Sequence, residues 1–191
     1  MFGLLAAVVV SGTAPPGIDT TVARWAGELP RAVTNPVRPL TSFGATLTVA
    51  VLFSVVAAIS TARERSLTVA TFLVAVLAGE ILLSNLVKAG LDRARPEVDQ
   101  LIGWSGASFP SGHAAAAAAG YAAVALVLAR GRSVAVGRWL LVGAVVMAIS
   151  VAASRVFLGV HWLTDVVAGL ALGWAWVALC AMVILDRRQA Q

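Results

Sequence analysis

The stretch PSGHAAAAAAGYAAVALVL, residues 110–128, runs from a short polar segment directly into an unbroken apolar one. Proline followed by small residues is typical of a helix start, because its ring fixes φ for the first turn. The backbone N–H groups of a first turn have no acceptor within the helix, and they attract anions. Ser111 can add a hydroxyl donor, Gly112 lets the backbone approach closely, and His113 can serve the same anion as a general acid. A histidine that only caps the helix is the alternative for His113.

Six consecutive alanines, Ala114 to Ala119, and then Gly120 follow this polar segment. In a bilayer a face of small residues lets helices approach closely, so this helix is expected at the centre of a bundle. The high helix propensity of alanine is the other explanation, and the two are compatible.

The whole chain has the composition of a membrane protein. Of its 191 residues 60% are hydrophobic and 12% are charged, and the mean hydropathy is +0.91. A spanning helix needs about 20 mainly apolar residues, so five or six of them leave room only for connecting loops. We therefore expect a single integral membrane domain over residues 1–191 and no separate soluble domain.

Five apolar segments are expected to cross the bilayer. They are Phe43 to Ala62, Leu67 to Leu86, Ala114 to Leu128, Trp139 to Ala153 and Leu163 to Leu185. Met1 to Val10 is also apolar, but it is too short to cross alone and lacks the basic flank of a signal peptide, so it is interpreted as a short or truncated first span. The expected fold class is all-α, a polytopic membrane helix bundle of about six transmembrane helices.

Residues 18–42 have a different pattern, with prolines at positions 30, 36 and 39. Apolar residues recur at helical spacing on one side, and charged residues fall largely on the other. The apolar set is Val22, Trp25 and Leu29, and the charged set is Arg24, Glu28 and Arg31. This predicts an amphipathic segment in the membrane interface, with an exposed loop as the alternative.

Basic residues between the spans indicate the topology of a chain whose net charge is +5. The arginines of the short loops and the tail are Arg63, Arg65, Arg130, Arg132, Arg138, Arg187 and Arg188. The positive-inside rule places them in the cytoplasm, so the loops after Leu86 and after Ala153 both open on the extracytoplasmic side. Charges separated by apolar spans do not form one basic face, which excludes a nucleic-acid partner. The arginine-rich, alanine-rich composition favours a bacterial cytoplasmic membrane.

The loop after Ala153 contains a candidate nucleophile. His161 and Asp165 are four residues apart, so on a helix that starts near His161 they lie on one face. A carboxylate bonded to one imidazole nitrogen fixes the tautomer and leaves the other nitrogen free to attack. Arg155 precedes them across a connection containing Gly159, and its guanidinium matches phosphate oxygens, although it can equally bind lipid headgroups at the membrane boundary.

The loop after Leu86 supplies further cations. Lys88, the only lysine in the chain, and Arg95 can stabilise the negative charge of a phosphoryl-transfer transition state. Four other charged residues of this loop are interpreted as solvated: Asp92, Arg93, Glu97 and Asp99. Glu80, inside a span, needs a polar partner, for which Asn85 or a backbone group is expected.

An obligatory metal is not expected. The chain has two histidines and one cysteine, and its acidic loop residues lack ligand spacing. Cys180 lies in the last apolar segment, where it is expected to serve packing.

Three motifs together resemble the type 2 phosphatidic acid phosphatase family of membrane lipid phosphatases. Lys-x6-Arg-Pro occurs from Lys88 to Pro96, Pro-Ser-Gly-His from Pro110 to His113, and Ser-Arg-x5-His-x3-Asp from Ser154 to Asp165, without departure at any specified position. The resemblance covers residues 20–185 approximately. It implies that the chain removes a terminal phosphate from a lipid phosphate or pyrophosphate, such as phosphatidic acid or an isoprenoid diphosphate like undecaprenyl diphosphate.

The resemblance also implies a role for each motif residue. His161 would form a phosphohistidine, Asp165 would orient it, and His113 would exchange the proton. The phosphate-binding residues would be Lys88, Arg95, Ser111, Gly112 and Arg155. It further implies no cofactor and no metal, and a site on the extracytoplasmic face. Trp25, Trp104 and Trp162 are expected near the mouth, where they can line the path of the lipid.

Two other functions are compatible with parts of the pattern. A non-catalytic protein that binds or transports lipid phosphates would use the same fold, but it would not need His113, His161 and Asp165 intact. Vanadate-dependent haloperoxidases have a similar anion pocket, but they would need a soluble fold and bound vanadate.

Overall fold

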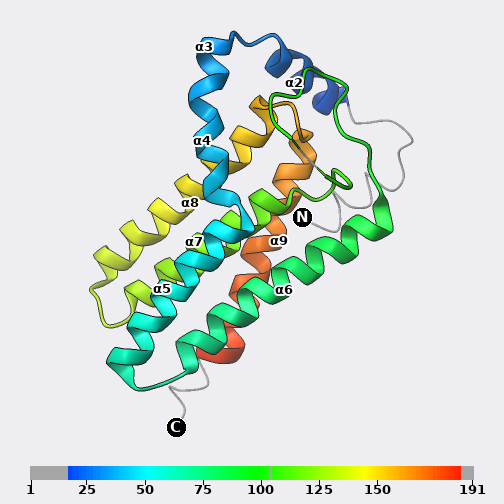
Figure 1. The fold of residues 1–191 in the computed structure, drawn as a ribbon. Coiled ribbons are helices and arrows are strands. Elements are labelled where there is room, and N and C mark those ends of the chain that lie inside the picture. Colours follow the sequence, from blue (N-terminus) through cyan, green and yellow to red (C-terminus); the bar gives the residue numbers. More distant parts are fainter. Residues whose placement is uncertain (1–16, 104, 186–191) are drawn as a thin grey trace.

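The computed structural model describes residues 17–103 and 105–185. The short first span expected at Met1 to Val10 lies outside the described residues. Described in chain order, the elements are α2 (Gly17–Gly27), α3 (Arg31–Thr34), η1 (Asn35–Val37), α4 (Arg38–Thr41), η2 (Ser42–Gly44), α5 (Thr46–Glu64), α6 (Thr68–Leu91), α7 (Gly112–Ala129), α8 (Val134–Phe157), α9 (Leu163–Cys180) and η3 (Ala181–Leu185) (Figure 1).

Five of these helices are long and apolar enough to cross a membrane, namely α5, α6, α7, α8, and α9 with its continuation η3. The expected all-α membrane bundle is therefore confirmed, and each of the five expected spans corresponds to one helix. Two helices are longer than the apolar segments, because α6 continues through Lys88 and α8 through Arg155. Apolar composition marks the part of a helix that lies in lipid, whereas backbone hydrogen bonding continues past it.

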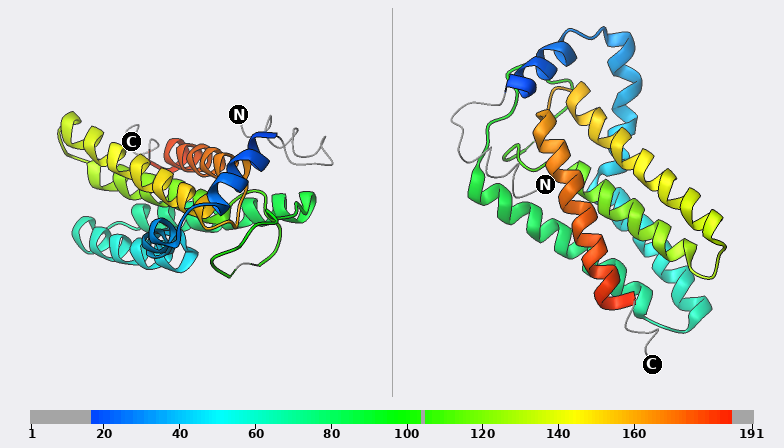
Figure 2. Two further views of the ribbon diagram at one scale, coloured as in Figure 1. Left: turned by 90° about the horizontal axis from the view of Figure 1, so that it is seen from above. Right: turned by 180° about the vertical axis from the view of Figure 1, so that it is seen from behind.

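Helix α7 lies at the centre of the bundle, as its small residues predict. It is the most buried of the five helices, and it packs most extensively against α8 and α9 (Figure 2). Gly169 and Gly173 of α9 make the closest approach. A Cβ at Gly169 would overlap the carbonyl oxygen of Ser111, just before α7, and a Cβ at Gly173 would overlap the carbonyl oxygen of Ala115 in α7. This is the packing that small residues permit between membrane helices.

The N-terminal segment 17–44 is helical rather than an exposed loop, and α2 lies across one end of the bundle (Figure 1). The face of α2 that packs against the bundle contains Asp19, Ala23 and Ala26, and Val22 is partly buried beside them. Trp25, from the predicted apolar face, is 51% exposed and forms a T-shaped ring pair with Phe157. Apolar spacing could not reveal that a carboxylate, Asp19, belongs to the buried face.

All three motifs meet at the end of the bundle where α2 lies. Helices α6 and α8 end there, and α7 and α9 begin there (Figure 1). The turns between α5 and α6 and between α7 and α8 are at the other end and carry Arg65, Arg130 and Arg132, whereas Arg63 lies in the last turn of α5 and Arg138 inside α8. The prediction that the loops after Leu86 and after Ala153 share one side of the membrane agrees with this arrangement.

Gly173→Ala is expected to destabilise the bundle, because the added methyl meets the Ala115 carbonyl and forces α9 away from α7. The expected loss is about 1–3 kcal/mol, the usual cost of overpacking a tight interface. Gly143→Ala is the matched control, since a Cβ there has open space around it. Thermal unfolding in detergent should show a lower midpoint for Gly173→Ala only, and equal midpoints would contradict this account of the interface.

Candidate active site

A cavity of about 720 Å³ opens at the end of the bundle where the motifs meet. Six of the eight predicted site residues line it: Lys88, Arg95, Gly112, His113, Arg155 and His161. The other two, Ser111 and Asp165, are fully buried beside these residues. One basic pocket thus gathers side chains or backbone from α6, α7, α8 and the loops before α7 and α9.

His161 and Asp165 form the predicted pair, but His161 lies outside the helix. Because α9 begins at Leu163, Asp165 is in its first turn, and the carboxylate turns back toward the preceding loop. Asp165 Oδ2 accepts a hydrogen bond from the Trp162 backbone N–H at 2.9 Å and lies 3.4 Å from His161 Nδ1. A proton held on Nδ1 by this carboxylate leaves Nε2 as the nitrogen with the lone pair.

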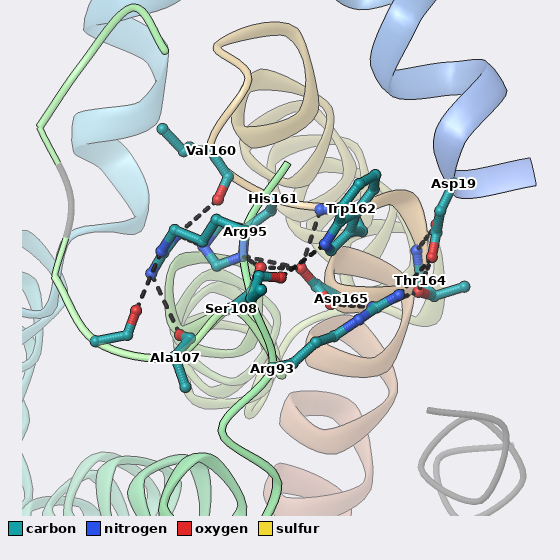
Figure 3. Close-up of polar contacts among 12 residues, drawn as sticks. Asp19, Arg93, Arg95, Ala107, Ser108, Val160, His161, Trp162, Thr164 and Asp165 are labelled. Atoms are coloured by element: carbon teal, nitrogen blue, oxygen red, sulfur yellow. Dashed lines mark hydrogen bonds and ion pairs between the residues drawn. The ribbon is translucent and has the colours of Figure 1, made fainter. Parts of the chain in front are cut away.

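Asp165 is held by two further donors that the sequence did not reveal (Figure 3). Ser108 Oγ donates to Oδ2, and Arg93 Nη1 donates to Oδ1 at 2.5 Å. Ser108 Oγ also lies 3.5 Å from His161 Nδ1. The carboxylate is 0% exposed, so these donors replace the water that an ion would otherwise need.

The prediction that Arg93 is a solvated loop charge is wrong. Its side chain is 10% exposed and forms ion pairs with Asp165 and, at 2.8 Å, with Asp19 of α2. The prediction holds for the other three charged residues of this loop, Asp92, Glu97 and Asp99, which are exposed. The prediction failed for Arg93 because its two carboxylate partners lie more than 70 residues away along the chain, so the local sequence does not indicate them.

Arg95 holds two loops together while it faces the cavity. Its guanidinium donates to the carbonyl oxygens of Val160, Ser105, Gly106 and Ala107, and its Nη1 lies 3.2 Å from His161 Nε2. Burial lowers the pKa of Arg95, and the charge of Asp165 opposes that shift. A positive charge is therefore fixed beside the nitrogen that Asp165 leaves free.

Lys88, in the last turn of α6, lies beside the N-terminus of α7. A Cβ built on Gly112 would be 3.8 Å from Lys88 Nζ, so the ammonium faces the backbone of the first turn. That turn begins at Gly112 with Ser111 as the N-cap, which places Pro110 outside the helix rather than in its first turn. The N-terminal dipole and the ammonium attract the same anion.

Arg155 faces inward rather than toward lipid headgroups. It is 4% exposed, and its Nη1 donates to Thr41 Oγ1 at 2.8 Å. The chain folds back after it as the position of Gly159 suggested, with φ +73° at this glycine. Two buried donors at the site, Arg155 Nε and Ser111 Oγ, have no hydrogen-bond partner in the described part of the chain. Buried donors of this kind are rare, and a bound anion would satisfy them.

Burial lowers the pKa of His161 to about 4, and the charges of Arg155 and Arg95 act in the same direction, while Asp165 opposes them. The imidazole is consequently neutral near pH 7, which is the nucleophilic form. Substrate binding would add negative charge beside the ring and so favour the imidazolium.

Other predicted features have mixed outcomes. Glu80 is 3% exposed and its partner is Ser84, whose Oγ donates to Oε1 at 2.8 Å, rather than Asn85. Cys180 is buried in the apolar core, as expected. Trp162 is buried against Ala94 and Trp25 does not line the cavity, while Trp104 lies outside the described residues. Within residues 17–103 and 105–185, no three histidine, cysteine or acidic side chains converge as metal ligands.

The fold and the site define an all-helical integral membrane protein with a histidine and aspartate pair facing a basic pocket. The family model of the PAP2 superfamily matches residues 68–189, and the chain belongs to this family. It resembles the crystal structure of a transmembrane PAP2 type phosphatidylglycerolphosphate phosphatase from Bacillus subtilis, with TM-score 0.87 and 26% identity over 98% of this chain and 92% of that chain. Aquifex aeolicus LpxE shares the fold, with TM-score 0.66 and 20% identity over 89% and 98% of the two chains.

Curated relatives match more locally. Phosphatidylglycerophosphatase B of Bacillus subtilis is 38% identical over 94 residues, which are 48% of this chain and 46% of the relative. Lipid A 1-phosphatase of Rhizobium johnstonii is 37% identical over 116 residues, 56% of this chain and 43% of the relative. Undecaprenyl-diphosphatase of Sulfolobus acidocaldarius is 38% identical over 77 residues, 40% and 33% of the two chains. The chain thus spans less than half of the length of these relatives.

The low pKa of His161 predicts that its ring remains neutral well below pH 6.5. Only two histidines are present, so ¹⁵N-histidine NMR of a His113→Asn variant reports His161 alone. The chemical shifts should show the Nδ1-protonated tautomer from pH 8 down to pH ~5, with titration only below that. A titration midpoint at or above 6.5, the usual value for histidine, would contradict the proposed burial effect.

Proposed function

We propose that this protein is a membrane lipid phosphatase that hydrolyses the terminal phosphate of a lipid phosphate or pyrophosphate. The observation that carries the proposal is the position of His161, which lines a cavity together with four basic residues, Arg38, Lys88, Arg95 and Arg155, while its Nδ1 faces Asp165. An imidazole whose Nε2 carries no proton, among fixed positive charges, suits attack on a phosphorus atom that carries negative oxygens.

The phosphoryl group would occupy the space between Nε2 and the first turn of α7. Lys88 Nζ, the Gly112 backbone, Ser111 Oγ and Arg155 Nε are the groups with donors to offer there. Arg95 contributes charge beside the reacting nitrogen, because its N–H groups already bind carbonyl oxygens. Positive charge at these positions stabilises the equatorial oxygens of the transition state.

The first step forms a bond between His161 Nε2 and phosphorus and breaks the bond from phosphorus to the lipid oxygen. The proton stays on Nδ1, where Asp165 accepts its hydrogen bond. The ring therefore becomes a phosphorylated imidazolium stabilised by the carboxylate. His113, which lines the same cavity, would donate a proton to the departing lipid oxygen.

The second step returns the enzyme to its starting state. His113, now neutral, takes a proton from water while the water oxygen attacks phosphorus. The bond from phosphorus to Nε2 breaks, and inorganic phosphate leaves. Each proton taken is returned, so the cycle balances, and we expect it to proceed without a metal or other cofactor.

The substrate class follows from the relatives and from the membrane setting. The relatives above include a phosphatidylglycerophosphatase, a lipid A 1-phosphatase and an undecaprenyl-diphosphatase, which supports a lipid phosphate or diphosphate as the substrate. The arginine-bearing turns lie at the end opposite the cavity, which supports a cytoplasmic location for them in a bacterial membrane and an extracytoplasmic site.

Two alternatives make different predictions. A non-catalytic lipid-phosphate binding or transport protein would not require a neutral histidine held by a carboxylate. Haloperoxidase chemistry would require bound vanadate in a soluble fold, whereas this chain has five helices that can cross a membrane.

The protein purified in detergent is expected to release phosphate from lipid phosphates in the presence of a metal chelator. His161→Ala should lower kcat by at least about 10³-fold, because the covalent route is lost. His113→Asn should lower it about 10²–10⁴-fold through loss of proton transfer. Rapid acid-free quenching with ³²P-labelled substrate should trap an acid-labile, base-stable phosphoenzyme in the wild type and none in His161→Ala. Activity that survives His161→Ala, or that the chelator abolishes, would overturn the mechanism.

A further inference from the structure

We propose that Arg93 and Asp19 are positioning residues for Asp165, and that α2 is thereby part of the catalytic apparatus. This inference rests on the proposed function, because it concerns how the nucleophile of that reaction is held. Arg93 lies outside the motif positions, and Asp19 lies outside the region that the family model matches.

Arg93 bridges two buried carboxylates. Its Nη1 donates to Asp165 Oδ1 at 2.5 Å, and its Nη2 donates to Asp19 Oδ2 at 2.8 Å (Figure 3). Both aspartates are 0% exposed. Two ionised carboxylates without water would repel each other and lose their hydration, so the guanidinium between them provides the compensating charge.

Asp19 anchors this bridge to the start of α9. Its Oδ1 accepts from the Thr164 backbone N–H at 2.9 Å, and its Oδ2 accepts from Thr164 Oγ1 at 2.6 Å. Thr164 is the residue before Asp165, so α2 holds the first turn of α9 directly. The ring of Trp162 lies 5.6 Å from the Arg93 guanidinium carbon and supports it from one side.

The two carboxylate oxygens of Asp165 bind different partners. Arg93 takes Oδ1, so the carboxylate plane is fixed and Oδ2 remains directed at Trp162 N and His161 Nδ1. Without Arg93, Oδ1 would lose this donor, and the orientation of the carboxylate would depend on the Ser108 hydroxyl and the Trp162 N–H alone. Arg93 does not line the cavity, so its loss should slow the chemical step and leave substrate binding nearly unchanged.

The test compares Arg93→Ala with Arg93→Lys and with Arg31→Ala. Arg31 is an exposed arginine of the same end of the bundle, and it pairs with Asp99. We expect Arg93→Ala to lower kcat about 10–100-fold with little change in KM, as for residues that orient a reacting group. Arg93→Lys should recover only part of the loss, because an ammonium cannot bind both carboxylates in the same plane. Arg31→Ala should match the wild type.

Chemical rescue distinguishes positioning from a general structural role. Guanidinium at tens of millimolar should raise the activity of Arg93→Ala several-fold, whereas sodium chloride at equal ionic strength should not, and neither should rescue His161→Ala. If Arg93→Ala does not fold, Asp19→Asn decides, since its single oxygen can still accept from the Thr164 backbone N–H, while the charge and the oxygen that accepts from Arg93 are lost; a several-fold lower kcat at unchanged KM supports the inference. Wild-type kcat in a folded Arg93→Ala or Asp19→Asn variant overturns it, while an inactive wild type would refute the proposed function instead.

A separate observation concerns the headgroup of the substrate. We infer that Glu80 binds hydroxyl groups of a glycerol or sugar headgroup that lies next to the scissile phosphate. One face of α6 lines the cavity over two turns, about 12 Å of helix. Its residues are Glu80, Ile81, Ser84, Asn85 and Lys88.

This wall is polar at a depth where α6 lies within the apolar span. A carboxyl group there is costly unless it meets polar partners, and Ser84 supplies one, to Oε1. The cavity volume of about 720 Å³ far exceeds the space of one phosphate and falls in the range of whole ligand sites. Headgroup hydroxyls would donate to the carboxyl group, whereas an isoprenoid chain attached directly to the phosphate would meet a wall of hydrogen-bonding groups.

The test uses phosphatidylglycerophosphate and phosphatidic acid with identical acyl chains, of which only the former has a glycerol next to its terminal phosphate, together with a second phosphate. The wild type should show higher kcat/KM for phosphatidylglycerophosphate. Glu80→Leu should reduce that ratio about 10–100-fold, the effect of losing a buried hydrogen bond to a carboxylate, while Glu80→Gln keeps an acceptor and part of the ratio. Leu82→Ala, on the exposed face of the same helix, is the control. Equal wild-type rates, or a ratio unchanged in Glu80→Leu, would overturn the inference, whereas hydrolysis of neither lipid would instead refute the proposed function.

Discussion

The burial of the Asp165 carboxylate is the constraint on which the site depends. An ion with no exposed surface has to recover its lost hydration from protein donors, and each of the four around Asp165 comes from a segment that must be placed accurately. Ser108 and Arg93 belong to the loop before α7, whereas His161 and the Trp162 backbone belong to the loop before α9. One carboxylate therefore fixes both loops, and with them the direction of the free His161 nitrogen.

An opposite constraint acts on the cavity side of His161. Lys88, Arg95 and Arg155 converge there, and the first turn of α7 adds its dipole. Like charges at close range repel, so this arrangement stores unfavourable electrostatic energy until an anion arrives. The site is negative behind the nucleophile and positive in front of it. In the proposed mechanism this separation would both orient the imidazole and favour a phosphate, and neither half would suffice alone.

The sequence predicted the bundle because apolar length is a local property that each span carries by itself. Helix ends were predicted less well, since Lys88 and Arg155 are polar yet continue their helices. The motif residues were predicted to share one site because their types and spacing are typical of phosphate chemistry, and they do line or adjoin one cavity. Arg93, Ser108 and Asp19 were missed for a physical reason. Their roles depend on partners 57–74 residues away, and no periodicity or composition reports such a pairing.

Elements outside the family match explain how the motif residues are held still. The match begins at residue 68, yet α2 supplies Asp19 to Arg93 and α4 supplies Thr41 to Arg155. Each contact ends on a side chain that pairs with Asp165 or lines the cavity. The proposed reacting groups thus belong to α6 to α9 and the loops before α7 and α9, whereas the N-terminal helices restrain them. Because positioning contributes to catalysis only when it persists through the transition state, the proposed mechanism depends on the N-terminal segment as much as the fold does.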